Sequence, residues 1–452
     1  MERKRLFIVL GLFSVWALIL PGKAQAVPSF ARQTGLSCDS CHTIFPELTP
    51  VGRDFKLKGY VLSKSKKPYE FPPPLTAYID ASYTHTQKAQ PSSLIKENNS
   101  SHFLSTGNDN INAPQYVSIF YAGRIVNNLG GFIQGTYGGV DDRVYLDSTD
   151  VRYADSVSVL GKNLVWGFTI NNNPSLEDLW NTTPAFRFPF NTSSVVPTPA
   201  AKTKIDGTLA QQVGGIGGYL FWNDLIYGAA SVYRTAKDGV TEFLGGGTHT
   251  AEVLDGVAPY WRLAIQRQWN EHSLSFGTYG MFTNIFPEDK STGPSNSFTD
   301  VALDAQYQFI TQKHVFTTAM TWIHEDQNWN AGFPLGSTAN SSNSLDTFRI
   351  TGSYYYRKTP IGSIGGAVSY FTTTGTTDNL LYAPANLTGN RTGSPDSNGF
   401  IIQLDYLPWD IVKLTLQYTI YDKFNGAHSN YDGFGRSASG NNTLFFHALV
   451  QF

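Results

Sequence analysis

Two cysteines and a histidine form the most chemically specific pattern in the 452-residue sequence, Cys38-Asp39-Ser40-Cys41-His42. The chain has 2 cysteines in all, and both lie in this pattern. A Cys-x-x-Cys-His pattern attaches a c-type haem, because both thiols add to the porphyrin vinyl groups and the adjacent histidine ligates the iron. We therefore predict one covalently attached haem c, bound through Cys38 and Cys41, with His42 as the proximal axial ligand. The alternatives are a thioredoxin-like redox pair or a small disulfide, but no strand–helix–strand pattern surrounds the motif.

The second axial ligand of such a haem has no obvious source near the motif. Residues 27–74 contain no methionine and no histidine other than His42, so a ligand of either type must come from further along the chain. Two candidates share the polar parity of their segments: Met281, and His447, which lies close to the C-terminus. Lys56, Lys58 or the absence of a protein ligand are the remaining possibilities.

The motif lies shortly after a pattern typical of export. Residues 2–5 are Glu-Arg-Lys-Arg, an apolar run follows from Leu6 to Leu20, and the small residues Ala24 and Ala26 come next. These are the charged region, apolar region and cleavage site of a secretory signal peptide. We predict that residues 1–26 are removed and that the mature protein is exported.

Residues 27–74 are expected to form a small cytochrome c module, mainly helical or irregular, that ends in a proline-rich linker. Short helices are predicted at Ser29–Thr34 and at Arg53–Ser63, with breaks at the intervening prolines. The triplet Pro72-Pro73-Pro74 predicts a stiff, extended connection to the rest of the chain.

Residues 75–452 are expected to form an all-β transmembrane barrel. From Leu75 onward, apolar and polar residues alternate in segments of about ten residues, for example in 300–309, 400–406 and 412–420. Such alternation is typical of barrel strands, but a soluble sandwich with its apolar faces inward also shows it. Alternation alone therefore does not decide between the two.

Three further features favour a membrane barrel of porin type. The segments number about 16, the predicted connections alternate in length, and the chain ends in the alternating stretch 444–452, closed by Phe452. An even number of strands places both ends on the periplasmic side. Short turns are expected near 127–129, 154–156, 223–224, 270–271, 311–313, 358–360 and 408–410, and long outer loops near 87–113, 172–210, 236–256, 286–296, 328–343, 375–396 and 425–441, with one short outer loop near 139–143.

The longest predicted loop, 172–210, is unusually apolar. It carries large side chains that a solvated loop would not keep exposed, namely Leu176, Leu179, Trp180, Phe186, Phe188 and Phe190. Long loops of this kind usually fold onto another part of the protein. Two placements are open at this point: the loop dips into the lumen as a constriction, or it packs on the outer rim.

Composition excludes several functional classes. Charged residues make up 15% of the chain and aromatic residues 14%, whereas soluble domains carry about 25% charged residues. The 33 basic and 35 acidic residues leave no basic excess for nucleic acid. The sequence also contains no Ser-His-Asp arrangement, phosphate loop or zinc-ligand spacing.

The segments around the haem motif resemble a known family. Pro28–Gly35, the haem motif and Pro46–Tyr60 are similar to the fused monohaem cytochrome–porins of iron-oxidising bacteria. The resemblance is close over these segments and extends to the remainder only in architecture and length. It implies an outer-membrane cytochrome that takes electrons from extracellular Fe(II) and passes them through one haem to a periplasmic carrier.

A single haem serves such a transfer best inside the barrel. The apolar band of an outer-membrane barrel is about 25 Å tall, and barrels of this strand number enclose an aqueous channel. We therefore predict that the module 27–74 occupies the lumen. Paired carboxylates in expected outer loops, Asp141-Asp142 and Glu177-Asp178, are candidate iron ligands, with ordinary solvated acids as the alternative.

Two other functions are compatible with the same residues. The first is a porin-like solute channel whose haem module is a plug or a sensor. The second is an electron conduit for a donor other than Fe(II), or for the opposite direction. The haem motif favours electron transfer, because a plug by itself has no need of iron.

Overall fold

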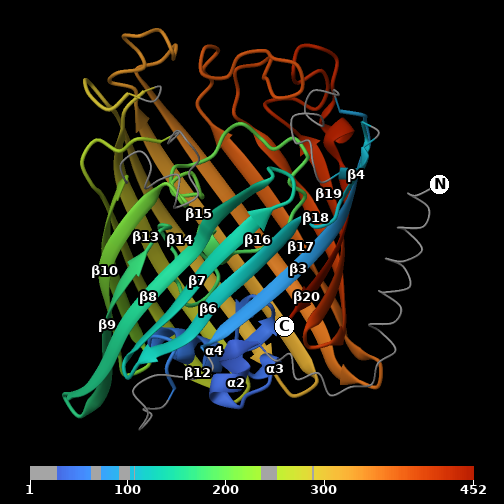
Figure 1. The fold of residues 1–452 in the computed structure, drawn as a ribbon. Helices are drawn as coiled ribbons and strands as arrows, with labels where there is room; N and C mark the ends of the chain where they lie inside the picture. The colour runs from blue at the N-terminus through green and yellow to red at the C-terminus, as the bar shows by residue number, and fades with distance from the viewer. Residues whose placement is uncertain (1–27, 63–72, 91–101, 106, 236–251, 288–289) are drawn as a thin grey trace.

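The computed structural model describes residues 28–62, 73–90, 102–105, 107–235, 252–287 and 290–452. The expected signal peptide lies outside these residues. Sixteen antiparallel strands close into a barrel (Figure 1). They are β3 (Leu75–Thr86), β6 (Tyr116–Val126), β7 (Leu129–Gly138), β8 (Arg143–Val159), β9 (Lys162–Asn171), β10 (Val213–Trp222), β11 (Ile226–Thr235), β12 (Ala258–Trp269), β13 (His272–Ile285), β14 (Asn296–Ile310), β15 (His314–Asn328), β16 (Ser342–Thr359), β17 (Gly362–Gly375), β18 (Ser397–Trp409), β19 (Val412–Lys423) and β20 (Thr443–Gln451).

The barrel closes where its last strand meets its first. β20 pairs with β3 along their lengths, with Phe446 opposite Tyr83. The other edge of β3 pairs with β6 near its start and, further along, with β5 (Asp109–Asn112) of a small hairpin whose other strand is β4 (His102–Ser105). This hairpin extends the wall on the outer side without adding a spanning strand. The predicted closed barrel of about 16 strands is confirmed.

The two faces of the wall have opposite polarity. In β14, Asp304, Gln306 and Gln308 point into the lumen and are buried, whereas Val301 and Leu303 point outward and are exposed. Apolar side chains outside and polar side chains inside are the arrangement of an outer-membrane barrel in lipid. The protein is therefore an outer-membrane barrel. Among the described residues, every helix is too short or too polar to cross a membrane.

The short turns lie together at the end of the barrel where the last strand finishes, as expected for the periplasmic side. One predicted turn position was wrong. Instead of turning near 154–156, β8 continues to Val159 and turns at Leu160 and Gly161, which have φ values of 54° and 71°. Two successive positive φ values are what a tight hairpin requires. Asp155 and Ser156 resemble turn residues in sequence, but here they continue the strand, and the β8–β9 hairpin projects below the other turns in Figure 1.

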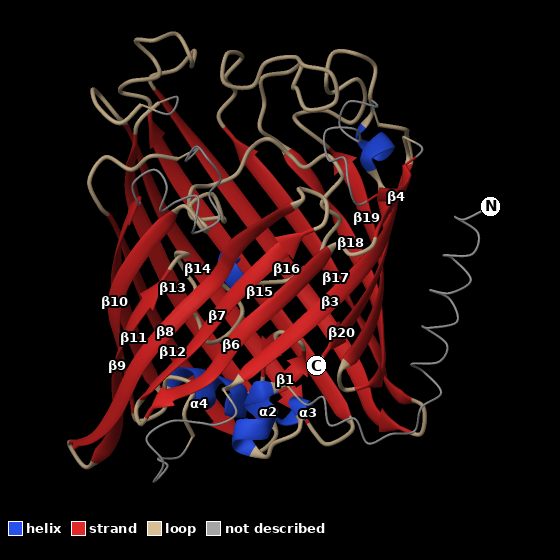
Figure 2. Cartoon of the chain, viewed as in Figure 1, coloured by secondary structure: helices blue, strands red, loops and turns tan. Residues whose placement is uncertain are grey.

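Residues 28–62, which we call the plug, lie inside the periplasmic end of the barrel (Figure 2). The plug contains α2 (Ser29–Thr34), α3 (Cys38–Cys41), the short pair β1 (His42–Ile44) and β2 (Glu47–Leu48), and α4 (Pro50–Leu57). The first predicted helix was correct. The second was placed too late, because Thr49 caps α4 by accepting a hydrogen bond from Gly52 N and Pro50 occupies its first turn.

Residues 172–212, which we call the inner loop, enter the lumen between β9 and β10. The loop contains the short 3₁₀ helix η1 (Pro184–Phe186), and its Trp180 is 1% exposed. Wall side chains donate to its backbone from β14, β15 and β16, as in the bonds from Gln306 to Trp180 O and from Arg349 to Phe188 O. The loop therefore lies in the lumen, and packing on the rim is excluded.

Candidate functional site

The haem motif is held by close backbone packing within the plug. The hydroxyl of Thr49 donates a hydrogen bond of 2.6 Å to Ser40 O, and Thr49 N donates to Cys41 O at 2.9 Å. Gly52 in α4 passes so close that a Cβ atom there would lie 2.2 Å from Cys41 O. This approach, which only glycine permits, presses the start of α4 against the turn that carries the two thiols.

Both cysteines and His42 line one cavity of about 560 Å³ between the plug and the barrel wall. This volume lies within the range of small-molecule and cofactor sites, about 300–1,000 Å³. The cavity wall is largely aromatic and aliphatic. Residues 181–191 of the inner loop contribute Asn181, Ala185, Phe186, Phe190 and Asn191 to it, and we call this segment the roof.

The aromatic part of the lining comes from a cluster within the plug. Phe30 and Phe55 make an edge-to-face contact at 4.8 Å between ring centroids, and Tyr60 stacks on Phe30 at 5.6 Å. All three line the cavity. Such rings offer an apolar surface against which a flat macrocycle packs without losing hydrogen bonds.

His42 has the chemistry of an iron ligand. Its Nδ1 is buried, and no described residue makes a well-aligned hydrogen bond with it. Burial lowers the pKa of His42 to about 4. The imidazole is consequently neutral at physiological pH, and a neutral ring nitrogen has the lone pair that a metal requires.

The two thiols are also kept uncharged. Burial, together with the nearby carboxylates of Asp410 and Asp39, raises the pKa of Cys38 to about 11. Burial and Asp39 raise the pKa of Cys41 in the same direction. In a haem c site these sulfur atoms would be neutral thioethers, so the largely apolar cavity beside both cysteines and the neutral imidazole fit that cofactor.

Arg357 in β16 joins the barrel wall to the motif by hydrogen bonds. Its guanidinium donates to the carbonyl oxygens of Asp39 at 3.0 Å, His42 at 2.9 Å and Thr43 at 2.7 Å. The next residue, Lys358, pairs with the Asp39 carboxylate at 2.9 Å from a more exposed position. Arg357 therefore fixes the backbone of the motif, and of the residue that follows it, to the barrel.

Arg53 fixes α4 to a nearby part of the wall, strands β13 and β14. Its guanidinium donates to Gln308 Oε1 at 2.7 Å, to Gln306 Oε1 at 3.2 Å and to Ser273 Oγ at 2.6 Å. Burial lowers the pKa of Arg53 to about 10, so the group is still charged at neutral pH. Together, Arg53 and Arg357 determine where the plug sits in the lumen.

Tyr60 makes a third attachment at β8. Its hydroxyl donates to Asp150 Oδ2 at 2.6 Å, and Arg152 Nε donates to the same oxygen at 2.7 Å. Gly130 of β7 lies directly beside this end of the plug, since a Cβ atom on it would lie 2.2 Å from Gly59 O. These contacts hold the plug against the wall strands β7 and β8.

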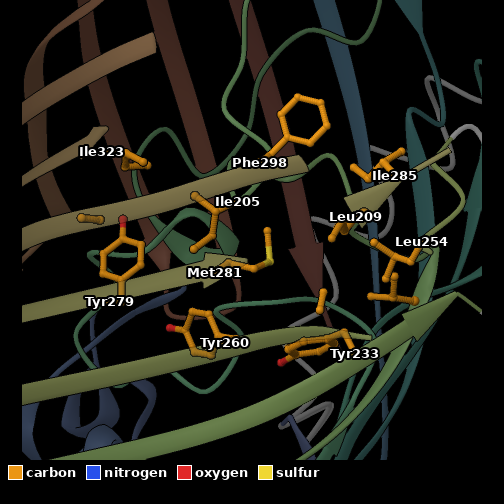
Figure 3. Close-up of a cluster of buried hydrophobic side chains, with 13 residues drawn as sticks. Ile205, Leu209, Tyr233, Leu254, Tyr260, Tyr279, Met281, Ile285, Phe298 and Ile323 are labelled. Atoms are coloured by element: carbon orange, nitrogen blue, oxygen red, sulfur yellow. The ribbon is translucent and has the colours of Figure 1, made fainter. Parts of the chain in front are cut away.

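The candidate distal ligands do not line this cavity. Met281 is packed in a separate apolar cluster with Tyr260, Tyr279 and Ile205 (Figure 3). His447 is buried against the wall, where its Nε2 hydrogen-bonds Asp80 at 2.9 Å. The structure therefore brings His42 to the cavity and leaves Met281 and His447 outside it.

The two lysine candidates differ in placement. Lys56 lines the cavity, but its amino group donates to Leu176 O and Asp178 O, both at 2.7 Å. Lys58 pairs with Asp54 at 2.7 Å on the half-exposed side of α4. In this arrangement the amino nitrogen of each lysine is bonded to oxygen atoms of the protein.

One of the candidate iron-binding pairs was misplaced. Glu177 and Asp178 are buried in the lumen rather than presented by an outer loop, and Asp178 Oδ1 pairs with Arg262 at 2.9 Å. Burial opposes ionisation of Asp178, but Arg262 and several backbone N–H groups outweigh it and hold the pKa below its usual range. Asp141 and Asp142 do lie in an outer turn. No group of three or more metal-ligating residues occurs among the described residues.

Sequence reasoning did not identify Arg53, Arg357 or the roof as parts of the site. Arg357 shares its strand parity with Tyr355, whose side chain also faces the lumen. That parity is a usable signal for an inward side chain, but it does not indicate which segment the side chain meets.

Comparison with solved structures finds similarity to bacterial outer-membrane proteins, channels and porins among them. No protein-family model matches the chain, and no curated protein matches its sequence. The channel DcaP of Acinetobacter baumannii is 12% identical, with 86% of this chain and 99% of that chain covered and a TM-score of 0.47. OmpF of Salmonella typhi in complex with daunomycin is 11% identical, with 84% and 97% covered and a TM-score of 0.46. An anion-selective porin from Comamonas acidovorans is 10% identical, with 83% and 98% covered and a TM-score of 0.44.

Proposed function

We propose that this outer-membrane barrel is an electron-transfer protein that carries one haem c. It takes electrons from extracellular Fe(II) and passes them to a periplasmic electron carrier such as a c-type cytochrome. The observation that supports this proposal is the convergence of Cys38, Cys41 and His42 on one cavity of about 560 Å³. The donor follows from the resemblance of the flanking residues to the cytochrome–porins.

In this proposal the chain supplies attachment, orientation and exclusion of water. Cys38 and Cys41 provide the covalent attachment, and His42 provides a neutral ring nitrogen to the iron. Arg357 fixes the plug to β16, Arg53 fixes it to β13 and β14, and the roof lines the cavity. When bound, the haem supplies one site that accepts and releases a single electron.

The electron balance requires no further co-reactant. Each Fe(II) outside is oxidised to Fe(III) and loses one electron, and one oxidised carrier in the periplasm gains it. The iron itself stays outside, so the poorly soluble product does not accumulate in the periplasm.

The test is a spectrum of the purified, oxidised protein before and after addition of Fe(II) at near-neutral pH. Growth of reduced c-type bands is expected, with Cys38→Ala/Cys41→Ala as the haem-free control. Reduction by dithionite but not by Fe(II) would show that the donor is different. A protein that lacks covalent haem after maturation would overturn the proposal and leave the alternative of a porin-like channel.

A further inference from the structure

Lys56 is the buried cation through which the plug meets the inner loop. The side chain leaves α4, is 6% exposed, and places Nζ 2.7 Å from both Leu176 O and Asp178 O. The same Nζ lies 5.1 Å from the centroid of the Phe186 ring in the roof. One charged group therefore holds two carbonyls and one aromatic ring of the inner loop.

The part of the loop that Lys56 holds is itself tied together by hydrogen bonds and to the wall by an ion pair. The carboxylate of Asp178 accepts hydrogen bonds from the backbone N–H groups of Trp180, Thr182 and Thr183. It also pairs with Arg262 of β12 at 2.9 Å. Asp178 thus joins the wall through its carboxylate and joins the plug through its carbonyl oxygen.

Beyond this point the inner loop follows the wall around the lumen. Its backbone or side chains bond to strands far apart in the barrel, through Thr321 in β15, Arg349 in β16, Gln417 in β19 and Thr84 in β3. The plug below it is bonded to β8, β14 and β16. Both layers are therefore fastened to several sides of the same lumen.

Within the part of the chain that the structure describes, few polar contacts join the two layers to each other. Besides the two bonds from Lys56, Leu48 N donates to Asn181 Oδ1 at 2.9 Å. A charged donor makes stronger hydrogen bonds than a neutral one, particularly where water is excluded. Lys56 is consequently the contact whose removal should loosen the layers most.

We propose that the plug and the inner loop form a two-layer stopper, clasped by Lys56, that closes this porin-like barrel to ions and hydrophilic solutes. The inference goes beyond electron transfer and does not depend on the electron donor. An electron passes through a packed layer, whereas a hydrated solute needs an open path. The stopper would therefore let the barrel pass electrons without also passing ions and hydrophilic solutes.

The experiment is single-channel conductance of the purified full-length protein in a planar bilayer. Wild type is expected to stay closed. Lys56→Met keeps the length of the side chain but removes its charge and donors, and it is expected to open about tenfold more often. Lys58→Met is the matched control, since Lys58 is the C-cap residue of the same helix and forms an ion pair with Asp54. Lys56→Arg, which keeps the charge, should stay closed.

The results separate the proposal from its alternatives. Steady conductance of the wild-type protein would refute closure of the barrel by the two layers. An opening frequency of Lys56→Met equal to that of wild type would refute the role of Lys56 in holding the layers together. Heat-modifiable migration on gels reports whether each variant is folded. If Lys56→Met does not fold, Asn181→Ala carries the test, because it removes the other polar contact between the layers. More frequent opening than in wild type would then support closure by contact of the two layers, and an unchanged opening frequency would refute it.

Discussion

The guanidinium of Arg357, in β16, donates a hydrogen bond of 2.9 Å to the carbonyl oxygen of His42, 315 residues earlier in the chain. The barrel wall therefore positions the backbone of the expected iron ligand directly. Replacement by methionine removes all three donated bonds, one of them fully buried and two partly buried. We expect Arg357→Met to destabilise the protein by about 3 kcal/mol and to reduce the amount of haem bound per chain.

The neighbouring residue provides the control for this prediction. Lys358→Met removes an ion pair to Asp39 from a side chain that is 59% exposed, which should cost less than about 1 kcal/mol. Urea unfolding in detergent micelles, followed by tryptophan fluorescence, measures both variants. Equal effects of the two substitutions would contradict the special role of Arg357.

Gly52 tests the close packing behind the haem motif. A Cβ atom at this position would lie 2.2 Å from Cys41 O, so Gly52→Ala should displace the turn that carries the thiols and cost about 1–3 kcal/mol. Gly352→Ala in β16 is matched to it, because a Cβ atom there would have no neighbour within 4 Å. We expect a loss of haem content and stability only in the first variant, and similar values for both would show that the approach relaxes at little cost.

The thiol of Cys38 should react slowly in protein that has not received haem. The reactive form is the thiolate, and a pKa of about 11 leaves very little of it at pH 7. In a Cys41→Ser background, the rate of alkylation by iodoacetamide should rise with pH until about pH 11. Asp410→Asn removes a negative charge that raises this pKa, so it should increase the rate at pH 7. A rate profile with its midpoint near that of a free thiol, about 8.5, would contradict the buried placement.

Met281 and His447 should not influence the haem spectrum. Both lie outside the cavity that holds the motif, and His447 is held by Asp80. We expect Met281→Leu and His447→Gln to leave the visible absorption bands of the oxidised and reduced protein unchanged. A shift of these bands in either variant, at normal haem content, would show that the residue reaches the iron.

The inner loop should resist proteases that cut the outer loops. Trypsin added to intact cells is expected to cleave after Arg391, which is exposed between β17 and β18, and to spare Arg187 of the inner loop. Fragment masses identify the site, and Arg391→Gln provides the control by removing that cut. Cleavage after Arg187 at a comparable rate would place the inner loop outside the lumen.

Much of the barrel was predictable because its signal is local. Each strand alternates between lipid and lumen, so the pattern of residues 300–309 identifies both faces of β14 without any knowledge of its neighbours. The turn after β8 was misjudged because Asp155 and Ser156 occur in turns and in wall positions alike. Only the pairing of β8 with β9 shows where the chain reverses.

The interior was harder to predict because its partners are far apart in sequence. Glu177 and Asp178 look like solvated acids of an outer loop, yet Asp178 is buried against Arg262. The alternation of polar and apolar residues correctly placed Met281 on the inner face of its strand. It did not show that Met281 lies in a cluster separate from the plug.

By itself, the sequence determined the features that depend on short spacing: the order of cysteines and histidine in the haem motif, the alternation of the strands and the number of strands. The tertiary structure decided which distant residues contact one another. Closure of β20 on β3 creates a lumen, and only inside it do Arg53, Arg357 and Lys56 find their partners. The physical reason is that a buried polar group must be paired, and the pairs available in a barrel are set by its closed geometry rather than by neighbours along the chain.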